Sequence, residues 1–212
     1  MNRIRVVLAD DHALILDGLR RILEPEMDIV AAVNDGEALV RAVEQYQPDL
    51  AVVDIAMPIL NGLDAMQRLR LTGCLAKFVF ITANPDITAA TRALRLGAAA
   101  YVLKMSATEE LLAAIHSAQQ GQVYITQRIA VEVLQRLNGR PSDAVGPGLT
   151  LRERQVLQLL AEGKTFKEAA LLLNVSPRTI EFHRNNIADK TGLRTTAELS
   201  RYARREGLVS DS

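Results

Sequence analysis

The sequence predicts an α/β domain built on a parallel sheet, followed by a smaller, all-helical domain. Up to about residue 121, short apolar runs alternate with helical patterns, which is typical of βα units. Residues 138–148, NGRPSDAVGPG, concentrate Gly, Pro, Ser and Asp without apolar periodicity and therefore predict a linker. Beyond that segment, no strand pattern is evident and capped helical patterns follow one another.

The elements of the first domain follow in order from these patterns. Apolar runs predict five strands, at about 4–9, 29–33, 50–53, 77–82 and 100–103. Helical patterns lie between and after them, at about 13–23, 35–46, 61–70, 86–96 and 108–120. We expect a five-stranded parallel sheet of order 2-1-3-4-5 in a domain spanning 1–121. Residues 122–148 form the predicted linker, which includes a short amphipathic helix at about Arg128–Leu137.

The predicted second domain, residues 149–212, has four helices that are marked by their own end signals. Thr150 and Glu153 form a capping box for the first helix, and Gly163 follows its end. The second helix runs from about Phe166 to Leu173. Ser176 and Pro177 then open a third helix that Gly192 ends, and Thr195 with Glu198 opens the last.

The composition indicates a folded protein whose charges are unevenly distributed along the chain. The 212 residues are 49% apolar, ample for packed cores, and their formal net charge is zero. This balance conceals a difference, because residues 1–125 carry 11 Lys and Arg against 15 Asp and Glu, whereas residues 150–212 carry 11 against 8. The modestly basic second segment suits a polyanionic partner.

Targeting signals and cysteine chemistry are not evident. No apolar run approaches the ~18–20 residues of a membrane span, and the MNRIRVV start is unlike a secretory signal. The lone Cys74 cannot form an internal disulfide. We therefore expect a soluble, cytoplasmic protein with no membrane contact.

Polar groups follow four of the predicted strands. Asp10 and Asp11 follow IRVVLA, Asp54 follows LAVV, Thr82 follows FVFI, and Lys104 follows YVL. Ligands of open α/β sheets bind outside the carboxyl ends of the strands. A single acid after a strand is more often a helix cap or a loop residue, so the prediction depends on all four equivalent positions together. They predict a pocket for a cation and a phosphoryl group.

The chemistry of that pocket follows from its residue types. A hard cation such as Mg²⁺ takes oxygen ligands, which Asp11 and Asp54 can supply. The Lys104 ammonium can offset the repulsion among the acids. Asp54, central in the predicted strand order, can act as a nucleophile towards phosphorus and form an acyl phosphate.

These residues resemble the receiver domain of two-component response regulators over the first ~120 residues. That family has paired acids, then D-x-x-M-P-x-x-N/D-G, then Ser/Thr, then Lys; here the second motif reads DIAMPILNG from Asp54 to Gly62. The resemblance implies a flavodoxin-like fold and phosphorylation of Asp54 by a histidine kinase. It further implies phosphoryl contacts from Thr82 and Lys104, inward movement of Tyr101 as a switch, and Mg²⁺ held by Asp10, Asp11, Asp54 and the backbone carbonyl of Ala56.

The second domain contains a helix, the short turn Asn174-Val175 and a further helix, an arrangement that presents the second helix to a DNA major groove. Residues 149–199 resemble the LuxR-type helix-turn-helix. By that resemblance, Glu181, Phe182 and Asn185 contact bases. The residues near the DNA backbone would be Lys167, Arg178, Thr179, His183 and Lys190.

The favoured interpretation is a transcription regulator of the NarL/FixJ type. Phosphorylation would promote homodimerisation and operator binding, with no enzymatic activity beyond the receiver's own phosphorylation and dephosphorylation. One alternative is a DNA-binding regulator whose receiver acts without phosphate. The other is an aspartyl-phosphate hydrolase, which is disfavoured because Ala56 stands where such enzymes commonly carry a second acid. The sequence identifies neither the kinase nor the operator.

Overall fold

The computed structural model describes residues 3–83, 85–105, 108–138, 148–206 and 208–209. The chain forms two compact units, residues 1–139 and 140–212. Among the described residues, no helix combines the length and apolar character needed to cross a bilayer.

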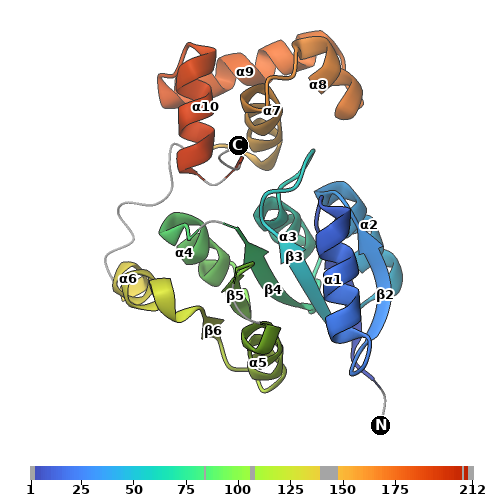
Figure 1. The fold of residues 1–212 in the computed structure, drawn as a ribbon. Helices are drawn as coiled ribbons and strands as arrows, with labels where there is room; N and C mark the ends of the chain where they lie inside the picture. Colours follow the sequence, from blue (N-terminus) through green and yellow to red (C-terminus); the bar gives the residue numbers. More distant parts are fainter. Residues whose placement is uncertain (1–2, 84, 106–107, 139–147, 207, 210–212) are drawn as a thin grey trace. The chain divides into compact units, whose positions relative to one another are not determined.

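The first unit is a six-stranded parallel sheet with helices on both faces (Figure 1). The strand order is β2-β1-β3-β4-β5-β6. The strands are β1 (Arg5–Ala9), β2 (Asp28–Val33), β3 (Leu50–Asp54), β4 (Lys77–Thr82), β5 (Ala100–Leu103) and β6 (Tyr124–Ile125). The helices are α1 (Ala13–Leu23), α2 (Gly36–Tyr46), α3 (Gly62–Leu71), α4 (Ile87–Arg95), α5 (Thr108–Gln119) and α6 (Gln127–Asn138).

The prediction of five strands is wrong by one, whereas the predicted order is confirmed for the first five. The sixth strand, β6, pairs with β5 in parallel, opposite Ala100 and Tyr101. It has only two residues, too few for a periodic apolar pattern. The first unit also extends beyond Gly121, our predicted boundary. The expected short helix forms as α6, but its Ile129 and Val133 are buried in the sheet's core rather than exposed in a linker.

Alternating apolar residues on the strands supply two cores, one on each face of the sheet. Val7, Val53 and Phe80 point towards the side covered by α2, α3, α4 and α6. Val6, Val52 and Ile81 point towards the side covered by α1 and α5. Successive side chains of a strand point to opposite faces, so each strand contributes to both cores. Because all the strands are parallel, their carboxyl ends lie at one edge of the sheet.

The second unit is all-helical, as predicted. It contains α7 (Leu151–Ala161), α8 (Phe166–Leu172), α9 (Pro177–Thr191) and α10 (Thr196–Arg205). The capping boxes at Thr150/Glu153 and Thr195/Glu198 form, and Ser176 caps α9. A further capping box, Thr165/Glu168, opens α8. The apolar core joins all four helices, with Ile180 and Ile187 of α9 fully buried.

Candidate functional site

The pocket lies at the carboxyl edge of the sheet, where the strand ends bring the predicted side chains together. Lys104 Nζ lies 2.8 Å from Asp54 Oδ2 and 2.6 Å from Asp10 Oδ2. The contact with Asp54 is a hydrogen bond, whereas the contact with Asp10 is a close ion pair that is poorly directed for one. One ammonium thus bridges two acids that are almost completely buried.

Burial and charge act in opposite directions on these groups. Burial raises the pKa of Asp54 above its usual value, even though the neighbouring Lys104 lowers it. Burial also disfavours the charged form of Lys104, but Asp54 and Asp10 outweigh this effect, so the pKa of the amine is raised. Lys104 is therefore protonated, and it lies beside an acid whose ionised form is disfavoured by burial.

The backbone orients the carboxylates. The His12 amide donates to Asp10 Oδ1 at 2.9 Å, and the Ala56 amide donates to Asp54 Oδ1 at 3.4 Å. At the end of β4, the Thr82 carbonyl accepts a hydrogen bond of 2.7 Å from the Lys104 amide, which ties the hydroxyl-bearing residue to the lysine. Asp10, Asp54, Thr82 and Lys104 therefore all stand at the same edge of the sheet.

The donor set fits a hard divalent cation. Ligand atoms of Asp10, Asp11, His12 and Asp54 all lie within 4.8 Å of one another. Three carboxylates with a single neighbouring ammonium leave negative charge that a cation can neutralise, and oxygen ligands match Mg²⁺. Asp10, Asp11 and Asp54 can thus supply oxygen ligands to such an ion. A ligand role for the Ala56 carbonyl stays a prediction.

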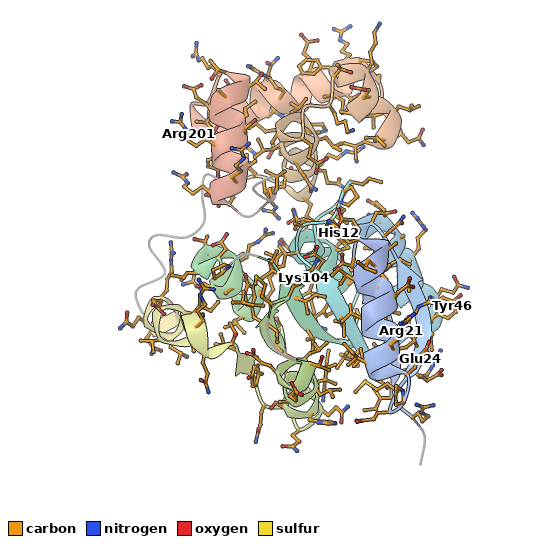
Figure 2. The ribbon with its side chains drawn as sticks, in the orientation of Figure 1. His12, Arg21, Glu24, Tyr46, Lys104 and Arg201 are labelled. Atoms are coloured by element: carbon orange, nitrogen blue, oxygen red, sulfur yellow. The ribbon has the colours of Figure 1, made fainter. Side chains whose placement is uncertain are left out.

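His12 belongs to this cluster, although we did not predict it. Its Nδ1 atom lies 2.7 Å from Asp11 Oδ1, and the side chain is largely exposed. Figure 2 shows His12 and Lys104 at the same end of the sheet. The available signal was the position of His12 directly after the acidic pair, and histidine can accompany carboxylates around a metal.

Two glycines allow the loop after Asp54 to fold tightly against the site. A Cβ atom on Gly62 would lie 2.3 Å from the Asp54 carbonyl oxygen, and one on Gly36 would lie 1.8 Å from the Leu60 carbonyl oxygen. Within the same loop, Ile59 adopts a φ of +71°. A positive φ is unfavourable for a β-branched residue, so the backbone of the loop after Asp54 is strained.

The candidate DNA-binding face lies on α9. Arg178, Glu181, Phe182 and Asn185 are exposed, and their spacing of three, four and seven residues places them on one side of the helix. Phe182 is 60% exposed, and its ring meets the His183 ring edge-on at a centroid distance of 5.6 Å. On α8, Lys167 is also exposed.

Three further residues predicted to contact DNA have structural partners or are partly buried. The Thr179 hydroxyl lies 2.8 Å from Ser176 Oγ within the cap of α9. His183 is half-buried, and burial, together with the nearby Arg152, lowers its pKa. Lys190 Nζ lies 2.7 Å from Glu153 Oε2. DNA contacts by these residues stay predictions.

Comparisons with known proteins agree with this division into two units. The family described as "Response regulator receiver domain" matches residues 6–116, and "Bacterial regulatory proteins, luxR family" matches residues 147–203. The transcriptional regulatory protein MctR of Rhizobium johnstonii is 33% identical over 210 residues, covering 98% of this chain and 96% of its own. LiaR of Bacillus subtilis is 31% identical, covering 98% of this chain and all of its own.

One solved structure has a similar fold over most of the chain. RcsB from Salmonella enterica serovar Typhimurium, bound to a promoter in the presence of phosphomimetic BeF₃⁻, is 25% identical with a TM-score of 0.62. The match covers 95% of this chain and 98% of RcsB.

The Lys190–Glu153 pair generates a prediction about the stability of the second unit. Burial opposes ionisation of Glu153, but hydrogen bonds from Lys190 and Thr150 outweigh it and lower its pKa. The ionised form of Glu153 therefore contributes stability at pH values above 4.5, its pKa in the unfolded chain, and this contribution is lost as the pH falls through the lowered pKa.

The substitution Lys190→Met leaves the buried Glu153 without its cation. Because the lysine is partly hydrated, we expect a loss of about 1–3 kcal/mol, less than for a fully buried pair.

Hydrogen exchange in α7 and α9 over a urea titration at pH 7 measures this loss, with Lys164→Met as the matched change at an exposed lysine. Unchanged stability combined with weaker DNA binding would contradict the pairing and make Lys190 a phosphate contact instead.

Proposed function

Because this chain belongs to the response regulators that join a receiver domain to a LuxR-type DNA-binding domain, we propose that phosphorylation of Asp54 controls its binding to DNA. The phosphoryl group would come from a sensor histidine kinase, and the output would be transcription of target genes. The observation that carries the proposal is the convergence of Lys104, Asp54 and Asp10 at the carboxyl edge of the sheet.

The proposed transfer is an attack of an Asp54 carboxylate oxygen on phosphorus. A P–O bond forms to Asp54 while the phosphoryl group leaves the kinase's histidine nitrogen, giving an acyl phosphate. Lys104 is already 2.8 Å from the carboxylate and would neutralise charge on the phosphoryl oxygens. The Thr82 hydroxyl, at the end of the adjacent strand β4, would donate a hydrogen bond to another of those oxygens.

Mg²⁺ would be held by Asp10, Asp11, Asp54 and the Ala56 carbonyl, and when bound it neutralises negative charge on the phosphoryl group. The protein's contribution is to hold these acids close together against their mutual repulsion. Lys104 reduces that repulsion before a cation or phosphoryl group arrives, because it pairs with two of the acids at once.

In the second unit, the exposed side of α9 would enter the major groove. Glu181, Phe182 and Asn185 would contact bases, and Lys167 and Arg178 would contact phosphates. A domain with so small an excess of positive charge would bind weakly on its own at cellular salt. We therefore include phosphorylation-dependent homodimerisation, which would engage two half-sites about one helical turn apart.

The relatives favour a regulator over an enzyme, since MctR and LiaR are transcriptional regulatory proteins. The promoter complex of RcsB with a phosphomimetic supports the link between a modified receiver and DNA for this chain. In the alternative, the receiver acts without phosphate. Replacement of Asp54 would then leave DNA binding unaffected, whereas our proposal predicts that it abolishes the activated state.

Phosphorylation can be tested with acetyl phosphate and Mg²⁺ on the full chain. We expect intact-mass spectrometry to find one added phosphoryl group in the unchanged protein and none in Asp54→Asn, because the amide lacks the nucleophilic oxygen. Asp17→Asn, the same change at an exposed acid on α1, should be labelled normally. Labelling that persists in Asp54→Asn would refute Asp54 as the acceptor.

The DNA-binding face can be tested by fluorescence anisotropy with a selected and a scrambled duplex over a range of salt concentrations. Asn185→Ala should cost about 1–3 kcal/mol on the selected duplex and little on the scrambled one, because a base contact carries sequence information. Arg178→Ala should weaken both duplexes equally and lower the salt slope by about one. If Asn185→Ala weakens both duplexes equally, α9 does not read bases through this residue.

A further inference from the structure

The loop that follows Asp54 ends at a buried asparagine. The side chain of Asn61 is completely buried, and its Nδ2 atom donates a hydrogen bond of 2.8 Å to Asp64 Oδ2. In return, the Asp64 amide donates a hydrogen bond of 2.9 Å to Asn61 Oδ1, which caps α3. The far end of the loop is therefore tied to the side chain of Asp64.

Asp64 is in turn held by a cation from the neighbouring helix. The Asp64 side chain is 1% exposed, and Arg92 Nη2 of α4 pairs with its Oδ1 atom. The same nitrogen lies 3.2 Å from Gln67 Oε1, one turn further along α3. Because breaking a buried ion pair is costly, α3 and α4 are firmly joined at this point.

Helix α4 is a well-anchored support for Arg92. Ala89 and Ala93 of this helix are buried in the core. At the start of the helix, the hydroxyl of the completely buried Tyr101 donates a hydrogen bond of 3.3 Å to the Asp86 carbonyl. Helix α6 packs beside α4 (Figure 1). Arg92 therefore holds α3 from a helix that is fixed by contacts of its own.

The loop has a reason to move if that attachment is lost. Ile59 adopts a φ of +71°, and such a conformation persists only where the surrounding structure imposes it. Near the start of the loop, the Ala56 amide donates a long hydrogen bond of 3.4 Å to Asp54 Oδ1. The Gly62 amide donates one of 2.9 Å to the Ile55 carbonyl and so joins the two ends of the loop. A shift of the far end would therefore reach Ala56 and the Asp54 carboxylate.

We propose that Arg92 and Asp64 are positioning residues for the phosphoacceptor pocket. Their ion pair holds the loop after Asp54 in the conformation that presents the Asp54 carboxylate and the Ala56 carbonyl to a divalent cation and a phosphoryl group. Both residues act through Asn61 rather than by contact with the reacting atoms. This inference rests on the proposed function and adds to it two side chains outside the pocket.

The effect of charge alone is opposite to the effect of positioning. Arg92→Met removes a positive charge from the receiver, which by itself would favour the binding of a cation. Loss of positioning weakens cation binding instead, because the oxygen ligands no longer stand where the ion needs them. Partners that orient metal ligands typically contribute a factor of about 10–100 to metal affinity. The direction of the change in affinity therefore distinguishes the two effects.

The test is Mg²⁺ binding to the full chain, measured by isothermal titration calorimetry, together with stability from a urea titration. We expect Arg92→Met to bind Mg²⁺ about tenfold more weakly than the unchanged protein. Arg92→Lys should lose less affinity, because a single nitrogen of Arg92 makes both contacts with α3. Arg95→Met makes the same change at an exposed arginine of α4 that contacts α6 instead, and it should bind Mg²⁺ normally.

A second substitution separates positioning from simple destabilisation. Arg92→Met takes the cation from a buried acid and should destabilise the receiver, whereas adding Asp64→Asn removes the buried charge and should recover part of that stability. The loop still lacks its tie to α4, so the double variant should bind Mg²⁺ as weakly as Arg92→Met. If Arg92→Met alone does not fold, the double variant is compared directly with the unchanged protein.

Two results would overturn the positioning role. Unchanged or tighter Mg²⁺ binding by Arg92→Met would mean that the loop keeps its conformation without α4. Recovery of Mg²⁺ affinity in step with stability in the double variant would give the pair a merely structural role. If the unchanged protein takes up no phosphoryl group from acetyl phosphate and Mg²⁺, the proposed function fails, and the positioning role falls with it whatever Arg92→Met does.

Discussion

The Lys104 ammonium, placed between Asp10 and Asp54, is the interaction on which the receiver depends. Two buried carboxylates this close to one another repel, and each loses hydration. A single cation within 2.8 Å of both allows them to share one pocket. Lys104 follows β5, whereas Asp10 and Asp54 stand at the ends of β1 and β3. The two ion pairs of Lys104 therefore link the carboxyl ends of three strands. A phosphoryl group on Asp54 or a bound cation would change this balance of charge, as our proposal for this pocket requires.

The backbone around Asp54 is closely packed. Gly62 and Gly36 allow backbone contacts that a Cβ atom would prevent, and Ile59 is held at a positive φ in the same loop. Asp64, at the start of α3, is buried and pairs with Arg92 of α4, so the neighbouring helices are joined as well. On the same side of the sheet, α6 packs against α4 and buries Ile129 and Val133 in the core.

The sequence predicted those features that follow from local pattern. Strand ends carrying acids, a hydroxyl and an amine lead to one pocket as soon as the sheet is parallel, and caps such as Thr150/Glu153 and Ser176 mark helix starts within a few residues. Features that depend on distant partners were not predictable in this way. β6 has two residues and exists through pairing with β5, while the docking of α6 requires α4 to lie beside it. Lys190 pairs with Glu153, which lies 37 positions earlier, and the resemblance that suggested a role for Lys190 at DNA gives no sign of this partner.

The most direct measurement of the central claim is the affinity of the full chain for a selected duplex, with Mg²⁺ and with or without beryllofluoride, in the unchanged protein and in Asp54→Asn. Sedimentation velocity on the same samples would report the state of assembly. The account predicts that beryllofluoride tightens DNA binding at least tenfold and shifts the protein to a dimer, and that Asp54→Asn shows neither response. Equal affinity with and without the mimic, under conditions where it occupies the pocket, would contradict control of DNA binding by Asp54.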